Sequence, residues 1–208
     1  QIDKGTLNAF QEHLLQGMNL QTKVEYHFTI QKSFKEEFLS SLRDLNNRFK
    51  HDYDVAFSFQ DQETDSFAFD HAFEPLKIDK EALLRRPAGH GALIENLVQI
   101  EDQYVLIKNI DNIQHIDRSD TSNDIWKTLC GILFEVKSKL RTIYLNPQFE
   151  GLHEFNKTYH LFTRQQLDAC HDEKSIKALL EKPVRVCGMV HNEGKAGGGP
   201  FFVRTGNG

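Results

Sequence analysis

Two kinds of periodicity alternate in the first part of the chain, and this alternation constrains the fold more than any other feature. Apolar residues recur at helical spacing over residues 6–18 and 34–49 but alternate with polar residues over residues 23–30 and 53–59. Helical spacing indicates one buried helix face, whereas strict alternation indicates a half-buried strand. The resulting α-β-α-β order predicts an α/β fold, a Rossmann-like, mostly parallel sheet with helices on both faces.

Later segments add elements of both kinds. We expect a short strand-like piece at Asp65, Phe67 and Phe69, a helix over 91–100, a loop over 119–123, the longest helix over 124–145 and a mixed segment over 146–156. The apolar run 104–110 is typical of a central parallel strand buried on both faces. Further strands are predicted over 184–190 and 201–204. Capping boxes are expected at Ser33 with Glu36 and at Thr163 with Gln166.

Composition narrows the function classes. The chain has 208 residues and a net charge of −5, which argues against a nucleic-acid partner because such surfaces usually carry a basic stripe. No apolar run approaches the length of a membrane-spanning helix. The three cysteines of the chain lack the spacing of metal ligands. We therefore expect a reduced, cytoplasmic protein in which the cysteines are small buried apolar residues.

The ends of the sequence indicate a fragment of a longer protein. The chain begins with Gln rather than Met and with a helix, whereas folds of this kind usually begin with a strand. We therefore predict one α/β nucleotidyltransferase-like domain over residues 1–208 that lacks its first strand and loop. The rest of its own longer chain would then be a partner.

A glycine-containing turn leads into the helix at residue 91. Pro87 is followed by Gly89, His90 and Gly91, and apolar residues begin directly afterwards. Glycine permits a positive φ or a close backbone approach by a ligand. The free N–H groups at the following helix start would suit an anion. The alternative is a tight loop whose glycines serve geometry alone.

Two further features are candidates for a binding site: the polar residues directly after the run 104–110, and a glycine-rich segment near the end of the sequence. Asp111 and Asn112 follow the predicted central strand, at the sheet edge where α/β folds bind ligands, although such a pair also occurs in turns and helix caps. The glycine-rich segment 194–200 is either a hairpin connection or a lid. The ten histidines show no metal-binding spacing, and no nucleophile–base pair can be read from the sequence.

Three stretches carry a resemblance to a known family. Residues 86–93, 107–112 and 184–190 resemble, in this order, the sugar-nucleotide pyrophosphorylases that make UDP-N-acetylglucosamine. A longer set of strings is similar to the bacterial domain-of-unknown-function family 4301. These strings are residues 58–60, 64–65, 86–87, 89–97, 108–112 and 197–201.

The resemblance implies a nucleotide-diphospho-sugar transferase (GT-A-like) fold and a set of binding roles. It places the nucleotide against Gln60, Arg86, Gly89, His90 and Gly91, the sugar against Asn112, Gly188 and Gly198, and Mg²⁺ on Asp111. It also matches Thr29 to a hydroxyl position at the strand edge, whereas Glu95 and Asn96 have only a weak indication of a role. His90 departs from the family's Asn, which leaves the base preference open.

These observations predict part of a sugar-phosphate nucleotidyltransferase that acts on a nucleoside triphosphate and a sugar phosphate. The family's triphosphate-binding loop has no counterpart in these residues, so the fragment alone should be inactive. The alternatives are a non-catalytic nucleotide- or sugar-binding module and a protein-interaction domain that keeps only the fold.

Overall fold

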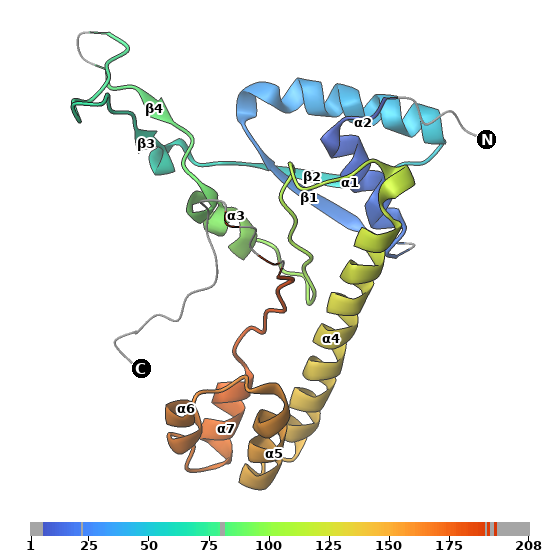
Figure 1. Ribbon diagram of the computed structural model, residues 1–208, viewed down its shortest axis with the longest axis vertical. Helices are drawn as coiled ribbons and strands as arrows, with labels where there is room; N and C mark the ends of the chain where they lie inside the picture. Colours follow the sequence, from blue (N-terminus) through green and yellow to red (C-terminus); the bar gives the residue numbers. More distant parts are fainter. Residues whose placement is uncertain (1–5, 22, 80–81, 190, 192–193, 195–208) are drawn as a thin grey trace. The chain divides into compact units, whose positions relative to one another are not determined.

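The computed structural model describes residues 6–21, 23–79, 82–189, 191 and 194 (Figure 1). The chain divides into two compact units, Gln1–Asn123 and Asp124–Gly208. Each unit has its own cluster of buried apolar residues. Each therefore has the basis of an independent core.

The first unit opens with the predicted α-β-α-β order. Its elements are α1 (Ala9–Met18), β1 (Glu25–Ile30), α2 (Lys35–Phe49) and β2 (Asp54–Phe59), drawn from dark blue to teal in Figure 1. The two strands pair in parallel over their whole length, from Glu25 opposite Asp54 to Ile30 opposite Phe59. Both helices pack on one face of this pair, rather than on both faces as predicted, in a cluster with the buried residues Phe10, Leu14, Leu45 and Tyr53. The predicted parallel β-α-β arrangement is confirmed, but the sheet has only these two strands among the described residues.

The starts of both helices differ from the predicted ones. α1 begins at Ala9 rather than at residue 6, and it is capped by Asn8, whose side chain forms a capping box with Gln11. The predicted capping box of Ser33 with Glu36 is wrong. A 3-10 turn, η1 (Lys32–Phe34), precedes α2 and places Phe34 at its N-cap, where no side chain caps the helix. Ser33 lies inside this turn, so it cannot occupy the capping position.

Two short strands follow. After η2 (Gln62–Thr64), β3 (Ser66–Phe67) pairs antiparallel with β4 (Arg85–Arg86), and bridges at Phe69–Pro75 and Lys77–Leu83 continue the hairpin outward. The predicted strand-like piece is therefore confirmed. The chain then forms η3 (His90–Leu93) and α3 (Ile94–Val98), so the predicted helix 91–100 starts as a 3-10 turn.

The predicted central strand over 104–110 is wrong. These residues form no β-ladder, and Val105, Leu106 and Ile107 are 39%, 43% and 60% exposed. An apolar run forms a strand only where a neighbouring strand pairs with its backbone, and the two-stranded sheet of the described residues offers none here. A short 3-10 turn, η4 (Ile116–Arg118), follows.

The helices of the second half are α4 (Asp120–Leu145), α5 (Phe149–Tyr159), α6 (Arg164–Asp168) and α7 (Glu173–Leu180). The loop predicted over 119–123 is wrong, because α4 already begins at Asp120 and Asn123 donates to the Ser119 hydroxyl at 3.2 Å. The mixed segment predicted over 146–156 is mostly helix α5. The capping box of Thr163 with Gln166 is confirmed.

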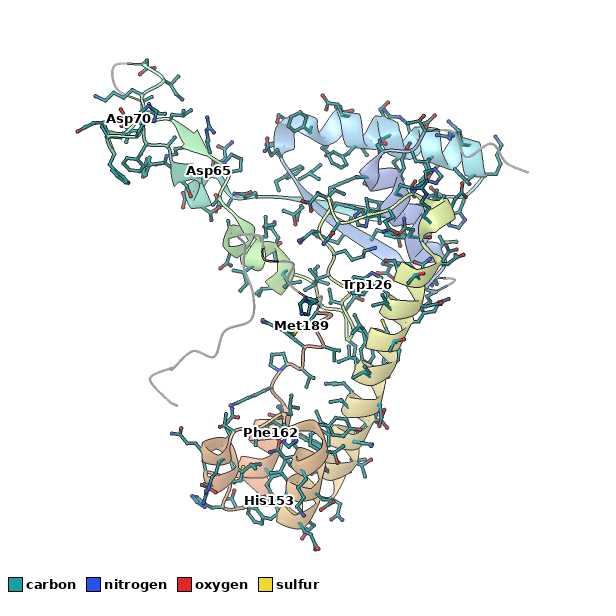
Figure 2. All side chains as sticks on the ribbon, viewed as in Figure 1. Asp65, Asp70, Trp126, His153, Phe162 and Met189 are labelled. Atoms are coloured by element: carbon teal, nitrogen blue, oxygen red, sulfur yellow. The ribbon has the colours of Figure 1, made fainter. Side chains whose placement is uncertain are left out.

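The second unit, Asp124–Gly208, is stabilised by a cluster of apolar residues. Its buried members are Val136, Leu140, Leu152, Phe155, Cys170, Ile176, Leu179 and Leu180, and Phe162, labelled in Figure 2, packs against them. Of the three cysteines, Cys170 is buried as expected, but Cys187 is exposed. No strand forms over residues 184–189, which corrects the prediction for 184–190 in that part, while the predicted strand 201–204 lies outside the described residues.

The described residues thus form a mixed α/β structure with a small parallel sheet and many helices. Within that part of the chain, no helix is both long enough and apolar enough to cross a membrane.

Candidate functional site

A polar cluster lies on the sheet face opposite to the two helices. The Ser58 hydroxyl is 2.7 Å from His27 Nε2 and 3.1 Å from Thr29 Oγ1. Because successive side chains of a strand point to opposite faces, Ser58 shares this face with His27 and Thr29, while Phe28 and Phe57 point to the core. Thr29 and Ser58 are also paired in the ladder, one residue before the end of each strand. The cluster therefore stands at the carboxyl end of the parallel pair.

Asn96 of α3 joins this cluster from a distant part of the chain. Its side-chain amide donates to the Ser58 hydroxyl at 3.0 Å and to the Phe59 carbonyl at 2.9 Å. The side chain is buried, at 8% exposure, so both hydrogen bonds compensate its loss of hydration. Asn96 thereby fastens α3, and with it the glycine-containing turn η3 just before α3, to the end of β2.

The glycine-containing turn has open space around it. Gly89 has φ −70° and Gly91 is absent from the positive-φ residues, so neither glycine is required by a left-handed backbone. A Cβ atom added at either position would meet nothing within 4 Å. The protein's own packing therefore does not explain these glycines, and a close approach by a ligand stays a prediction. The His90 side chain lies outside the described part of the structure.

Gln60 and Arg86 lie on the segments that lead out of β2 and into the turn. Gln60 is half-buried, and its amide donates to Asp65 Oδ1 at 3.4 Å, next to β3 (Asp65 is labelled in Figure 2). Arg86 ends β4 and pairs with Ser66 of β3. The hairpin thus connects the predicted nucleotide-binding residues Gln60 and Arg86 within one unit.

Asp111 and Asn112 lie in an exposed turn rather than at the end of a strand. The main-chain N–H of Asn112 donates to the main-chain carbonyl of Asn109 at 3.2 Å, and this hydrogen bond closes the turn. Among the described residues, no group of three or more His, Cys, Asp or Glu side chains could hold a metal ion. Mg²⁺ often binds through one or two carboxylates together with substrate phosphates, and the single exposed carboxylate of Asp111 fits that kind of site.

The segment that carries this turn is fastened to α1. His13 Nε2 lies 3.2 Å from the Ile110 carbonyl oxygen, and the Gln16 amide donates to the Gln114 carbonyl. Burial of the ring, and then the charge of Lys108, lower the pKa of His13. Burial also lowers the pKa of Lys108. The lowered pKa of His13 favours a neutral ring in contact with this segment.

The residues predicted to contact the sugar are divided between the two units. Asn112 lies in the first unit, whereas Gly188 lies in the second, where an added Cβ would stand 3.2 Å from Leu129 Cδ1. Close packing against Leu129 thus explains the glycine at position 188 without a ligand. Gly198 lies outside the described residues.

The sequence did not point to His27 or Ser58 as site residues and gave Asn96 little weight. One signal was present, because small polar side chains occupy the second face at the ends of both strand patterns. Which helix reaches that face could not be read from it, since Asn96 is 38 positions away from Ser58.

The model of one protein family, described as "Domain of unknown function (DUF4301)", matches residues 1–208. The comparison with curated proteins and the comparison with solved structures gave no match.

Proposed function

The chain belongs to the DUF4301 family, and from that premise we propose that it forms the nucleotide-binding part of a sugar-phosphate nucleotidyltransferase. The reaction joins a nucleoside triphosphate and a sugar 1-phosphate into a nucleotide sugar and releases diphosphate. The fold proposed with it is that of the nucleotide-diphospho-sugar transferases, of which the β1–α2–β2 unit would be a part.

One observation carries this proposal: Asn96 connects the glycine-containing turn to the carboxyl end of the parallel strands, at Ser58 and Phe59. Open α/β sheets bind their ligands outside the carboxyl ends of the strands. A turn with two glycines and open space, fastened at that edge, suits a planar base that needs close contact with main-chain groups.

The proposed roles follow from position. Gly89 and Gly91 admit the base to the backbone, and the Gln60 amide, at the end of β2, reads its polar edge. Arg86 supplies a positive charge to the phosphates from β4. Asp111 offers one carboxylate for Mg²⁺, which when bound would neutralise phosphate charge. The sugar phosphate attacks the α-phosphoryl group in line, and diphosphate leaves.

The test is a thermal-shift panel of nucleoside triphosphates and nucleotide sugars with Mg²⁺, on this chain and on any longer protein that contains it. A ligand that binds only the folded state raises the melting temperature. Gly89→Val should abolish the shift without unfolding the protein, because its side chain meets open space. Gly131→Val is the matched control, since Gly131 also has nothing within 4 Å but lies on α4 in the second unit. A shift that Gly89→Val leaves intact contradicts the proposed base site.

A second candidate is a protein-interaction domain that keeps only the fold. The exposed apolar side chains of Val105, Leu106 and Ile107 favour it, because clustered exposed apolar residues mark contact surfaces. This candidate predicts no response to any member of the nucleotide panel. It also predicts that Ile107→Lys weakens self-association or partner binding while the melting temperature stays within about 1 °C.

A further inference from the structure

Helix α1 buries an unusual number of polar side chains. Gln11, Glu12, His13 and Gln16 are 4%, 4%, 9% and 2% exposed. Buried polar groups are costly unless they have hydrogen-bond partners, so each of these should be explained by a contact. Gln11 is explained by α2, because its amide donates to the Ser41 carbonyl and to Asp44 at 3.1 Å.

The other three side chains meet the segment that runs from Ile110 to His115. His13 Nε2 lies 3.2 Å from the Ile110 carbonyl, which can only accept, so the neutral ring must carry its proton on Nε2. Gln16 donates to the Gln114 carbonyl and, at 3.3 Å, to Glu12 Oε2. Glu12 thus acts on the segment through the Gln16 amide, because its other oxygen, Oε1, stands 3.7 Å from His115 Nε2 and has no hydrogen-bond partner among the described residues.

These contacts hold the segment on both sides of Asp111 and Asn112. Two main-chain carbonyls, one before the turn and one after it, are bound by side chains one helical turn apart on α1. Fixing both ends of a short segment removes most of the conformations open to the residues between them. Apolar contacts in the same place would leave the carbonyls unpaired and would tolerate slippage of the segment.

We propose that Glu12, His13 and Gln16 are positioning residues, which hold the Asp111–Asn112 turn in the geometry that binds a Mg²⁺–nucleotide complex. This inference rests on the proposed function. The three side chains touch no ligand. They act as the outer partners of a metal-binding carboxylate do when these fix the orientation of the group that contacts the ion.

The test compares changes on α1 that differ in which partner they remove. His13→Leu and Gln16→Leu remove the donors to the segment, whereas Gln11→Leu removes a buried amide of the same helix that serves α2. His13→Gln keeps an N–H donor and should rescue in part. It also covers the case in which His13→Leu fails to fold.

Two readouts are measured on each variant of the full chain. The first is amide hydrogen exchange over residues 110–115, including the Asn112 amide that closes the turn. The second is the affinity for ATP and UTP with Mg²⁺ and without it. We expect His13→Leu and Gln16→Leu to speed exchange in this segment and to weaken Mg²⁺-dependent binding by about 10- to 100-fold. Gln11→Leu should leave both readouts at their wild-type values.

Each other outcome identifies what is wrong. Unchanged exchange over 110–115 in His13→Leu or in Gln16→Leu overturns the anchoring, and so does an exchange rate in His13→Gln as fast as in His13→Leu. Faster exchange with unchanged Mg²⁺-dependent affinity overturns the positioning role but not the proposed function. If wild-type protein binds neither nucleotide, the proposed function fails, and the metal role of the turn fails with it.

Discussion

The ring of Tyr26 occupies the space beside Gly17 that any larger residue would need. A Cβ atom at Gly17 would stand 2.5 Å from the Tyr26 hydroxyl oxygen and 2.6 Å from its Cε1. The ring cannot easily retreat, because its hydroxyl donates to the Leu14 carbonyl at 2.7 Å. Burial also raises the pKa of this hydroxyl, so it stays protonated and keeps donating. One glycine thus sets how closely β1 approaches α1.

Gly17→Ala should therefore destabilise the protein by about 1–3 kcal/mol, the usual cost of overpacking. Alanine is otherwise favoured over glycine inside a helix by about 1 kcal/mol, so the sign of the effect is informative. Gly131→Ala in α4 is the control and should stabilise, because its Cβ meets open space. Urea unfolding measures both changes. A stabilising Gly17→Ala would mean that Tyr26 does not pack against this helix.

Asn96→Asp tests the connection between α3 and β2. The substitution replaces the amide donor with a carboxylate that faces the Phe59 carbonyl and the Ser58 hydroxyl. Loss of the donor in a buried site should cost about 2–3 kcal/mol. Hydrogen exchange should then rise in α3. Gln99→Glu, an exposed change of the same kind at the end of α3, should stay within about 0.5 kcal/mol.

His13 predicts an acid-sensitive stability. Its pKa in the folded state lies below the ordinary value of 6.5, because of burial and then the charge of Lys108. The unfolded chain therefore takes up a proton at a pH where the folded protein does not. Stability should fall as the pH drops from about 6.5 towards the folded-state pKa, by at most about 1.4 kcal/mol per pH unit from this group.

His13→Gln should flatten this part of the stability curve between pH 7 and pH 5. The measurement is urea unfolding in a series of buffers. His153, exposed on α5 and labelled in Figure 2, provides the control for the same substitution at a histidine that is not buried. Equal curves for wild type and His13→Gln would show that the ring is not buried as described.

Two Ala substitutions at helix starts test where capping occurs. Thr163→Ala removes a side chain that accepts from the Gln166 amide at 3.2 Å, and it should cost about 1 kcal/mol. Ser33→Ala should change stability by less than about 0.5 kcal/mol, because Ser33 lies exposed in η1 and caps no helix. Thermal unfolding of both variants compares them directly. A larger loss at Ser33 would restore the capping box that the sequence pattern suggested.

Asp111→Asn tests the proposed metal ligand. The turn is exposed, so the melting temperature without ligand should not change by more than about 1–2 °C. The part of the nucleotide-induced shift that depends on Mg²⁺ should disappear, since an amide is a poorer ligand than a carboxylate for a hard cation. Chelation of Mg²⁺ in the wild type should have the same effect. Transfer activity that survives Asp111→Asn in a longer protein would remove Asp111 from the metal site.

The sequence predicted the parts of the fold that depend on neighbouring residues. The spacing around Leu14 and Leu45 identified two helices whose apolar faces are buried, and alternation identified both strands of the parallel pair. It failed where the outcome depends on a distant partner. The run 104–110 looks apolar enough for a central strand, but apolarity reports a tendency to be buried and cannot supply the strand that would pair with it.

The same limit applies to the candidate site. Gly89, Gly91 and Asp111 were proposed from short motifs, and no contact in the structure decides their roles. The hydrogen bond between Asn96 and Ser58, in contrast, could not be predicted from the sequence, because the residues around either position do not indicate the other as its partner. Ser119 and Asn123 were assigned to a loop for their polarity, yet they hydrogen-bond to each other at the start of α4. Polar residues predict a loop only when their partner is water.

The contacts of α1 with the Ile110 and Gln114 carbonyls have a consequence for how this family can diverge. Every residue presents the same main-chain carbonyl, so His13 and Gln16 hold the segment without regard to the side chains it carries. Substitutions at Asp111, Asn112 and Ile113 would leave that support in place. In the proposed site, the turn is therefore a position where substitutions can change ligand preference without loss of the support beneath it.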